Sequence, residues 1–248
     1  MSDALVLSGR ALRLSRRTTD ALVTALVLPV LLMVLFVVLF GGALDTGTAY
    51  VQYVVPGVLL LSAGFGASTT AVAVSTDLAG GTVDRLRSLD VRGAALLTGH
   101  VTASVVRNLV STFLVVLVAL GLGFRSAAGP LAWLAAAGVL TAFVVTLSWL
   151  SAVLGLLARS AEAAGGFTFL VSFLPYPSSA FVPVATLPGW LQGFAAHQPV
   201  TPVIETLRGL LLGTPVGSYP VQALAWCAGL LVISVVLAEV LFTRRTSR

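Results

Sequence analysis

The sequence predicts an all-α integral membrane protein with six transmembrane helices, and two observations support this fold class. Hydrophobic residues make up 58% of the chain, charged residues only 9%, and the mean hydropathy is +1.04. A soluble domain has about 25% charged residues, because a surface in water must be solvated. The apolar residues also form discrete runs bounded by charged residues, proline or glycine. Most of the protein surface must therefore face lipid.

Six apolar runs are candidates for membrane crossing, which needs about 20 mainly apolar residues. The first run is preceded by a cluster of arginines, as in a secretion signal, but its 20 residues exceed the roughly 7–15 residues of a cleavable core. We expect it to be retained as the first span. The six predicted spans are residues 21–40, 51–74, 108–124 (in a helix that begins near residue 97), 130–157, 165–182 and 221–242.

The basic residues predict the orientation of these spans. All fourteen are arginines, and eleven of them fall in segments that six spans would place on the same side as the N-terminus. Only Arg125 and Arg208 fall on the other side, and Arg107 lies within or just before the third span, from where its long side chain can snorkel. Because cytoplasmic loops are enriched in arginine and lysine, both termini are predicted to be cytoplasmic.

Residues 1–18 are too short and too charged to cross a membrane. A helical projection of this segment places its arginines and its apolar residues on different faces, which predicts a helix lying in the cytoplasmic interface. The alternative is a disordered basic tail. The two faces carry Arg10, Arg13 and Arg17 on one side and Leu7, Ala11 and Leu14 on the other.

The segment before the last predicted span is rich in proline. Residues 175–220 contain eight of the eleven prolines, with apolar pieces such as Trp190–Ala196 and Val203–Leu212 between them. These pieces are too short to cross about 30 Å of hydrocarbon. We predict short external or re-entrant helices over residues 183–219, since irregular backbone at membrane depth must be covered by protein or line a cavity.

The sequence contains none of the usual catalytic or metal-binding patterns. Without lysine, these 248 residues cannot form a Walker A loop. Cys227 is the single cysteine, and His100 and His197 are predicted on opposite membrane faces in solvated interfacial positions. The acidic residues nearest the spans, Asp20, Asp77 and Glu239, all fall at predicted cytoplasmic ends, which disfavours an ion-coupled carrier. We expect no catalytic, cofactor or metal site in this chain.

Residues 80–93 form a charged segment between the second and third predicted spans. As a helix, this segment would carry a narrow apolar stripe of Val83, Leu86 and Leu89, with Thr82 as its N-cap. Such a helix is suited to docking on a partner protein at the membrane surface. A solvated turn that follows the positive-inside rule explains the charge equally well. The charged side chains are Asp84, Arg85, Arg87, Asp90 and Arg92.

Two stretches of this sequence resemble a known family. DLAGGTVDRLRSLDVRGAALLTGHV is similar to the cytoplasmic coupling segment of type-2 ABC exporter permeases, and SSAFVPVATLPGWLQGFAAHQPVTPVIETLRGLLLG resembles the region before the last span in their daunorubicin-resistance branch. Family members commonly have proline after RLRSL, where this chain has Asp90. The resemblance implies a single transmembrane domain over residues 1–248 with a coupling helix at 80–93. The implied coupling residues are Asp77, Thr82, Asp84, Arg85, Leu86, Arg87, Leu89 and Arg92.

The resemblance also implies the partners. Two separate ATP-binding subunits would hold ATP and magnesium, and a second permease copy or a paralogue would complete the assembly, with no role for nucleic acid. The implied function is export of a drug, a polyketide antibiotic or a lipid-like molecule across a bacterial cell membrane. Export of polysaccharide or lipid intermediates is the nearest alternative, and an ion-coupled secondary carrier is a more distant one.

The same resemblance points to a substrate path along the second and fifth spans. In this sequence the second span carries Ser68 and Thr69, and the fifth carries Phe169 and Phe173. Aromatic walls with sparse hydroxyls suit an amphipathic organic molecule. Ordinary helix packing with lipid-facing aromatics is the alternative explanation for these residues.

Overall fold

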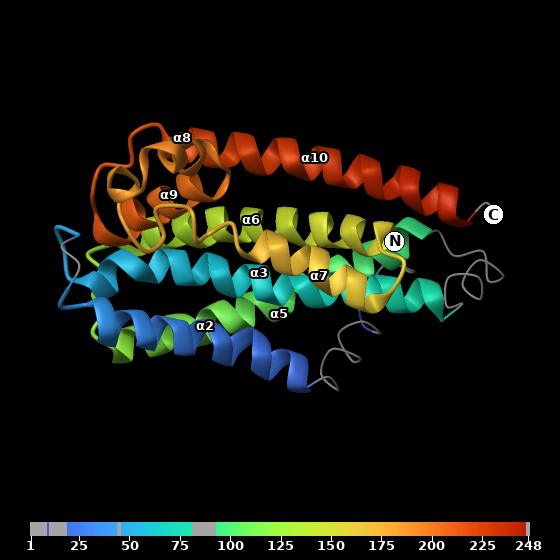
Figure 1. Cartoon of the computed structure of the whole chain (residues 1–248), viewed down its shortest axis with the longest axis horizontal. Coiled ribbons are helices and arrows are strands. Elements are labelled where there is room, and N and C mark those ends of the chain that lie inside the picture. The colour runs from blue at the N-terminus through green and yellow to red at the C-terminus, as the bar shows by residue number, and fades with distance from the viewer. Residues whose placement is uncertain (1–8, 10–18, 44–45, 81–92, 247–248) are drawn as a thin grey trace.

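The computed structural model describes residue 9 and residues 19–43, 46–80 and 93–246, and all regular structure in this part of the chain is helical. The long helices run lengthwise beside one another (Figure 1). The all-α prediction is therefore confirmed. Residues 1–8 and 10–18 of the predicted interfacial helix, and residues 81–92 of the predicted coupling helix, lie outside the described residues.

Among the described residues, four helices are long and apolar enough to cross a membrane. They are α3 (Tyr50–Ala79), α5 (Gly93–Gly121), α6 (Pro130–Leu157) and α10 (Tyr219–Thr246). A fifth helix, α2 (Thr19–Phe40), has described side chains only from Val27, and this part is also apolar. These five helices correspond to the first, second, third, fourth and sixth predicted spans. The third begins well before residue 108, in agreement with the expected start near residue 97.

The fifth predicted span, residues 165–182, differs from the expectation of one continuous helix. Helix α7 covers only Ala161–Ser172, about 18 Å at 1.5 Å per residue, and the chain then continues in tight turns to residue 182. Hydrogen bonds from Phe173 to Leu170 and from Tyr176 to Phe173 close these turns three residues apart. The apolar run predicted a crossing helix, but the prolines at positions 175 and 177 cannot continue an α-helical ladder.

Short helices follow α7, as predicted for residues 183–219. A 3-10 turn (Val184–Thr186) precedes α8 (Gly189–His197) and α9 (Val200–Leu212). Helix α9 ends at Gly213, whose φ of 70° is left-handed and favours glycine. Both helices lie at one end of the bundle, opposite the end at which α3 stops and α5 starts (Figure 1). Their depth in the membrane stays a prediction.

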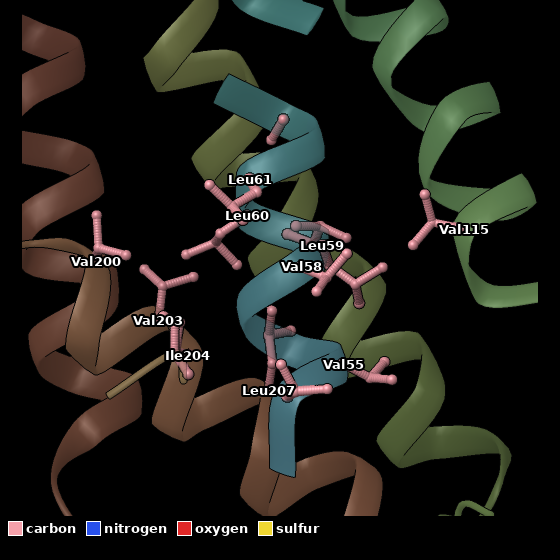
Figure 2. Close-up of a cluster of buried hydrophobic side chains, with 14 of the residues drawn as sticks. Val55, Val58, Leu59, Leu60, Leu61, Val115, Val200, Val203, Ile204 and Leu207 are labelled. Atoms are coloured by element: carbon pink, nitrogen blue, oxygen red, sulfur yellow. The ribbon is translucent and has the colours of Figure 1, made fainter. Parts of the chain in front are cut away.

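Helix α3 is the centre of the structure. It packs against α2, α5, α6, α7 and α9, and most of its side chains are buried. Figure 2 shows Val203, Ile204 and Leu207 of α9 directed toward the N-terminal half of α3. The approach of α6 to α3 requires glycine at position 155, because a β-carbon there would lie 2.5 Å from the carbonyl oxygen of Ala71. Small residues permit such close helix contacts within a membrane, where apolar burial between helices gives little driving force.

Candidate functional site

The first candidate region lies where α3 and α5 flank the charged segment. The Nε2 atom of His100 on α5 lies 2.9 Å from Oδ2 of Asp77 on α3, and the two side chains are 9% and 17% exposed. The expectation of a solvated His100 is therefore wrong, because this side chain is buried against α3. The contact ties together the two helices that residues 80–92 connect. Asp77 is the one predicted coupling residue with a described position; Thr82, Asp84, Arg85, Leu86, Arg87, Leu89 and Arg92 lie outside the described residues.

A second region is a polar seam between α3, α5 and α6. Arg107 lies at the middle of α5, and its Nη2 atom donates to the carbonyl oxygen of Gly66 at 3.1 Å and to Oγ1 of Thr70 at 3.3 Å. The Arg107 side chain therefore contacts α3. It was expected only to extend along α5 toward water. An ionisable side chain at this depth is costly unless it is paired, and such residues usually mark functional sites in membrane proteins.

Buried hydroxyl and amide groups extend the seam. Ser104 of α5 contacts Ser148 of α6 at 2.9 Å between their hydroxyl oxygens, and the Nδ2 atom of Asn108 donates to the carbonyl oxygen of Ser104 at 3.0 Å. The hydroxyls of Ser62 and Ser111 lie 3.2 Å apart. Sequence reasoning missed this seam, although the polar residues of α5 repeat at helical spacing, at positions 104, 108, 111 and 112.

The predicted substrate-path residues lie on two helices that pack together. Gly64 is close to Ser172, and Gly165 is close to Val72, so α3 and α7 run antiparallel in contact. Ser68 lies on α3 midway between Gly64 and Val72, the two positions that contact α7. It is therefore at the same height as the middle of α7. The hydroxyl of Ser68 donates to its own helix at Phe65 (2.7 Å), and that of Thr69 donates to Gly66 (2.9 Å). Neither hydroxyl has its proton free for a ligand in this conformation.

Phe169 and Phe173 begin a continuous row of aromatic rings. They are 50% and 44% exposed, and their centroids lie 4.8 Å apart in an edge-to-face arrangement. The row continues from Phe173 through the turns after α7 and reaches α2, with centroid separations of 4.4 to 5.4 Å. We call this set the aromatic row. Its members are Phe169, Phe173, Tyr176, Phe181, Phe36 and Phe40.

Arg208 of α9 is a third feature, and the sequence predicted it only as an external arginine. Its side chain is buried and donates to the backbone carbonyls of Tyr53 and Ser179 and to the carboxylate of Glu205. The guanidinium carbon lies 3.7 Å from the centroid of the Tyr53 ring. One arginine therefore joins α9, α3 and the turns after α7. The planar guanidinium with five donors permits this arrangement, which a lysine could not reproduce.

Comparison with known proteins identifies the family behind this architecture. Residues 3–212 match the ABC-2 type transporter family, a range that includes the helices from α2 to α9. The chain belongs to the ABC-2 type transporter family. The resemblance drawn from the charged segment and the proline-rich segment is thereby confirmed. The charged segment lies inside the matched range of this ABC-2 protein, and the proline-rich segment lies inside it as far as residue 212.

Two similar proteins are named for drug resistance. The chain is 33% identical over 177 residues to the daunorubicin resistance ABC transporter permease protein DrrB1 of Streptomyces coeruleorubidus, covering 71% of this chain and 62% of the relative. It is 28% identical over 194 residues to the probable doxorubicin resistance ABC transporter permease protein DrrC of Mycobacterium tuberculosis, covering 78% of this chain and 70% of the relative. The chain thus spans less than two thirds of the length of the Streptomyces protein.

Proposed function

We propose that this ABC-2 chain is the membrane-spanning permease subunit of an ATP-driven exporter of amphipathic organic compounds. The observation that supports this proposal most is the family match over residues 3–212, together with relatives named for daunorubicin and doxorubicin resistance. The drug-resistance relatives favour this function over export of polysaccharide or lipid intermediates. They also favour it over ion-coupled transport.

ATP hydrolysis belongs to a separate subunit in this proposal. The 248 residues contain no lysine, which a Walker A loop needs against the nucleotide phosphates. Two ATP-binding subunits would hold ATP and magnesium and dock on residues 80–93. A second copy of this chain or a paralogue would complete the permease.

The arrangement of helix ends supports the proposed orientation. The end of α3, the start of α5 and the end of α10 all lie at one end of the bundle (Figure 1). Arg159, just after α6, and Arg244, near the end of α10, belong to this same end. We place this end in the cytoplasm, because the positive-inside rule relates arginine-rich loops to that side.

A reconstitution with and without the ATPase tests the proposal. The purified chain alone is expected to hydrolyse no ATP, and the cognate ATPase is expected to hydrolyse faster when the permease is added. Replacing both Arg85 and Arg87 by Glu should abolish that stimulation while leaving the amount of membrane-inserted protein unchanged. An Arg125→Glu variant is a matched control, since Arg125 is exposed and lies outside the coupling segment. ATP hydrolysis by the isolated chain, or full stimulation by the double variant, would contradict the proposal.

A further inference from the structure

The interruption of α7 leaves an apolar cavity on the side of the bundle formed by α6, α7 and α10. The cavity has a volume of about 60 Å³ and is lined by side chains of α3, α6, α9 and α10 and by the end of α7. Helix α6 packs against both α7 and α10, and it is visible between them in Figure 1. The aromatic row takes another course, from α7 to α2, and none of its rings lines this cavity.

The lining of the cavity offers almost no polar partner. Most of its wall is hydrocarbon, including Leu60, Phe143, Leu147 and Val200. The Ser172 hydroxyl donates to the carbonyl of Thr168 at 3.0 Å, and the Thr146 hydroxyl donates to the carbonyls of Ala142 and Cys227. Since both hydroxyl protons are already used within the protein, the cavity favours an apolar occupant over water.

The mouth of the cavity is continuous with the lipid-facing surface. Trp226 on α10 contributes to the wall and is 42% exposed, and Leu170, one residue before the lining Val171, is 67% exposed. With 58% hydrophobic and 9% charged residues, the chain must present such surfaces to the hydrocarbon of the bilayer. An occupant can therefore enter sideways from the membrane without crossing a polar region.

The size of the cavity decides which apolar group fits. An engineered apolar cavity of about 150 Å³ holds one benzene molecule, whereas this cavity is about 60 Å³. A polycyclic drug is too large, but the end of a flexible hydrocarbon chain is narrow enough. We propose that the cavity between α6, α7 and α10 binds the terminal part of a phospholipid acyl chain, which fills the space left where α7 ends.

Photo-crosslinking from the lipid tests this site directly. The full chain would be reconstituted in vesicles of phosphatidylcholine and phosphatidylglycerol that contain a phosphatidylcholine with a diazirine at the end of one acyl chain. After illumination, mass spectrometry of peptides would map the labelled residues. We expect labelling to concentrate at lining positions such as Leu147, Leu150 and Cys227. Labelling spread evenly over the exposed apolar residues would overturn the proposal. This experiment uses the wild-type chain, so it does not depend on whether a variant folds.

Variants that fill the cavity sharpen the test. Val171→Phe and, independently, Leu147→Phe should reduce labelling of the other lining residues at least fivefold, because the larger ring occupies the space. Val232→Phe is the matched control on α10, since Val232 is 62% exposed and is not part of the cavity wall. Unchanged labelling in a folded filling variant would overturn the proposal. Competition by excess doxorubicin would also overturn it, since the site would then take cargo rather than lipid.

Discussion

The guanidinium of Arg208 lies over the aromatic ring of Tyr53 and also donates a hydrogen bond of 3.0 Å to the carbonyl oxygen of the same residue. A second bond, 2.7 Å long, reaches the carbonyl of Ser179. Helix α9 is thereby attached both to α3, the central helix, and to the turns that follow α7. This buried cation holds the short helices of the proline-rich segment against the bundle.

We predict that Arg208→Ala destabilises the protein strongly, because the substitution leaves Glu205 and two backbone carbonyls without their donor. Removing one member of a fully buried ion pair costs about 3–5 kcal/mol, and we expect a smaller cost here because the Glu205 side chain is 23% exposed and its charge is partly screened by solvent. The midpoint of thermal unfolding in detergent should be clearly lower for Arg208→Ala than for the wild type. The midpoint of Arg208→Lys should lie only slightly above that of Arg208→Ala. Arg125→Ala serves as the control, since this arginine is exposed at the same end of the bundle. Equal midpoints for the Arg208 and Arg125 variants would disprove the anchoring role.

The polar seam gives a second prediction. A β-carbon at Gly66 would lie 2.0 Å from the Oδ1 atom of Asn108, so Gly66→Ala must displace a buried side chain. Overpacking of this kind costs about 1–3 kcal/mol. Gly138→Ala on α6 has open space and should stabilise its helix by up to about 1 kcal/mol.

A double-mutant cycle isolates this contact. Shortening Asn108 to Ala should remove the clash, so the double variant Gly66→Ala with Asn108→Ala should be less destabilised than the sum of the single variants. Unfolding midpoints of the four proteins supply the test. If the destabilisation of the double variant equals the sum of the two single effects, a β-carbon at position 66 does not clash with the Asn108 side chain.

The contact between Asp77 and His100 gives a third prediction, about coupling. Because it joins the two helices that carry the charged segment, Asp77→Ala should lower the amount of drug exported per ATP hydrolysed without abolishing hydrolysis. His100→Ala should have the same effect, and the double variant should be no worse than either single one. The ratio of efflux to phosphate release measures this. If the double variant lowers the ratio of efflux to phosphate release by the product of the two single effects, the two residues do not act through a shared contact.

The exposed end of the aromatic row gives a fourth prediction. Replacing Phe169 or Phe173 by Ala should change the relative export of several amphipathic drugs several-fold, because these rings are half-exposed on and directly after α7, the helix that packs against α3. Phe113→Ala is the control, since Phe113 is 62% exposed on α5 and is not a member of the row. If all three variants export the drugs in wild-type proportions at normal expression, the row does not contact substrate.

Much of the fold was predictable from composition and periodicity. The long apolar runs predicted α2, α3, α5, α6 and α10, because a membrane-crossing helix needs about 20 consecutive, mainly apolar residues, and such a run is visible in the sequence. The interruption of α7 at Ser172 was predictable in principle from the two prolines beyond it, but the uniform hydrophobicity of residues 165–182 concealed it.

Long-range contacts were not predictable in the same way. Arg208 and Tyr53 are 155 positions apart, and His100 and Asp77 are 23 apart, so no local pattern indicates that they meet. The sequence placed Arg208 only on the external side and His100 in a solvated interfacial position. In the folded chain, carbonyl and carboxylate partners offset the cost of burying them, and such partners become visible only when the helices are packed together.

The most direct test of the proposed function is drug uptake by inside-out vesicles that contain this permease and its cognate ATPase. Doxorubicin fluorescence would be followed after addition of ATP, a non-hydrolysable ATP analogue, or an imposed proton gradient without nucleotide. The account predicts uptake with ATP alone, unaffected by a protonophore and absent when the ATPase subunit is omitted. Uptake driven by the proton gradient without the ATPase, or failure of ATP to drive uptake by the complete assembly, would contradict it.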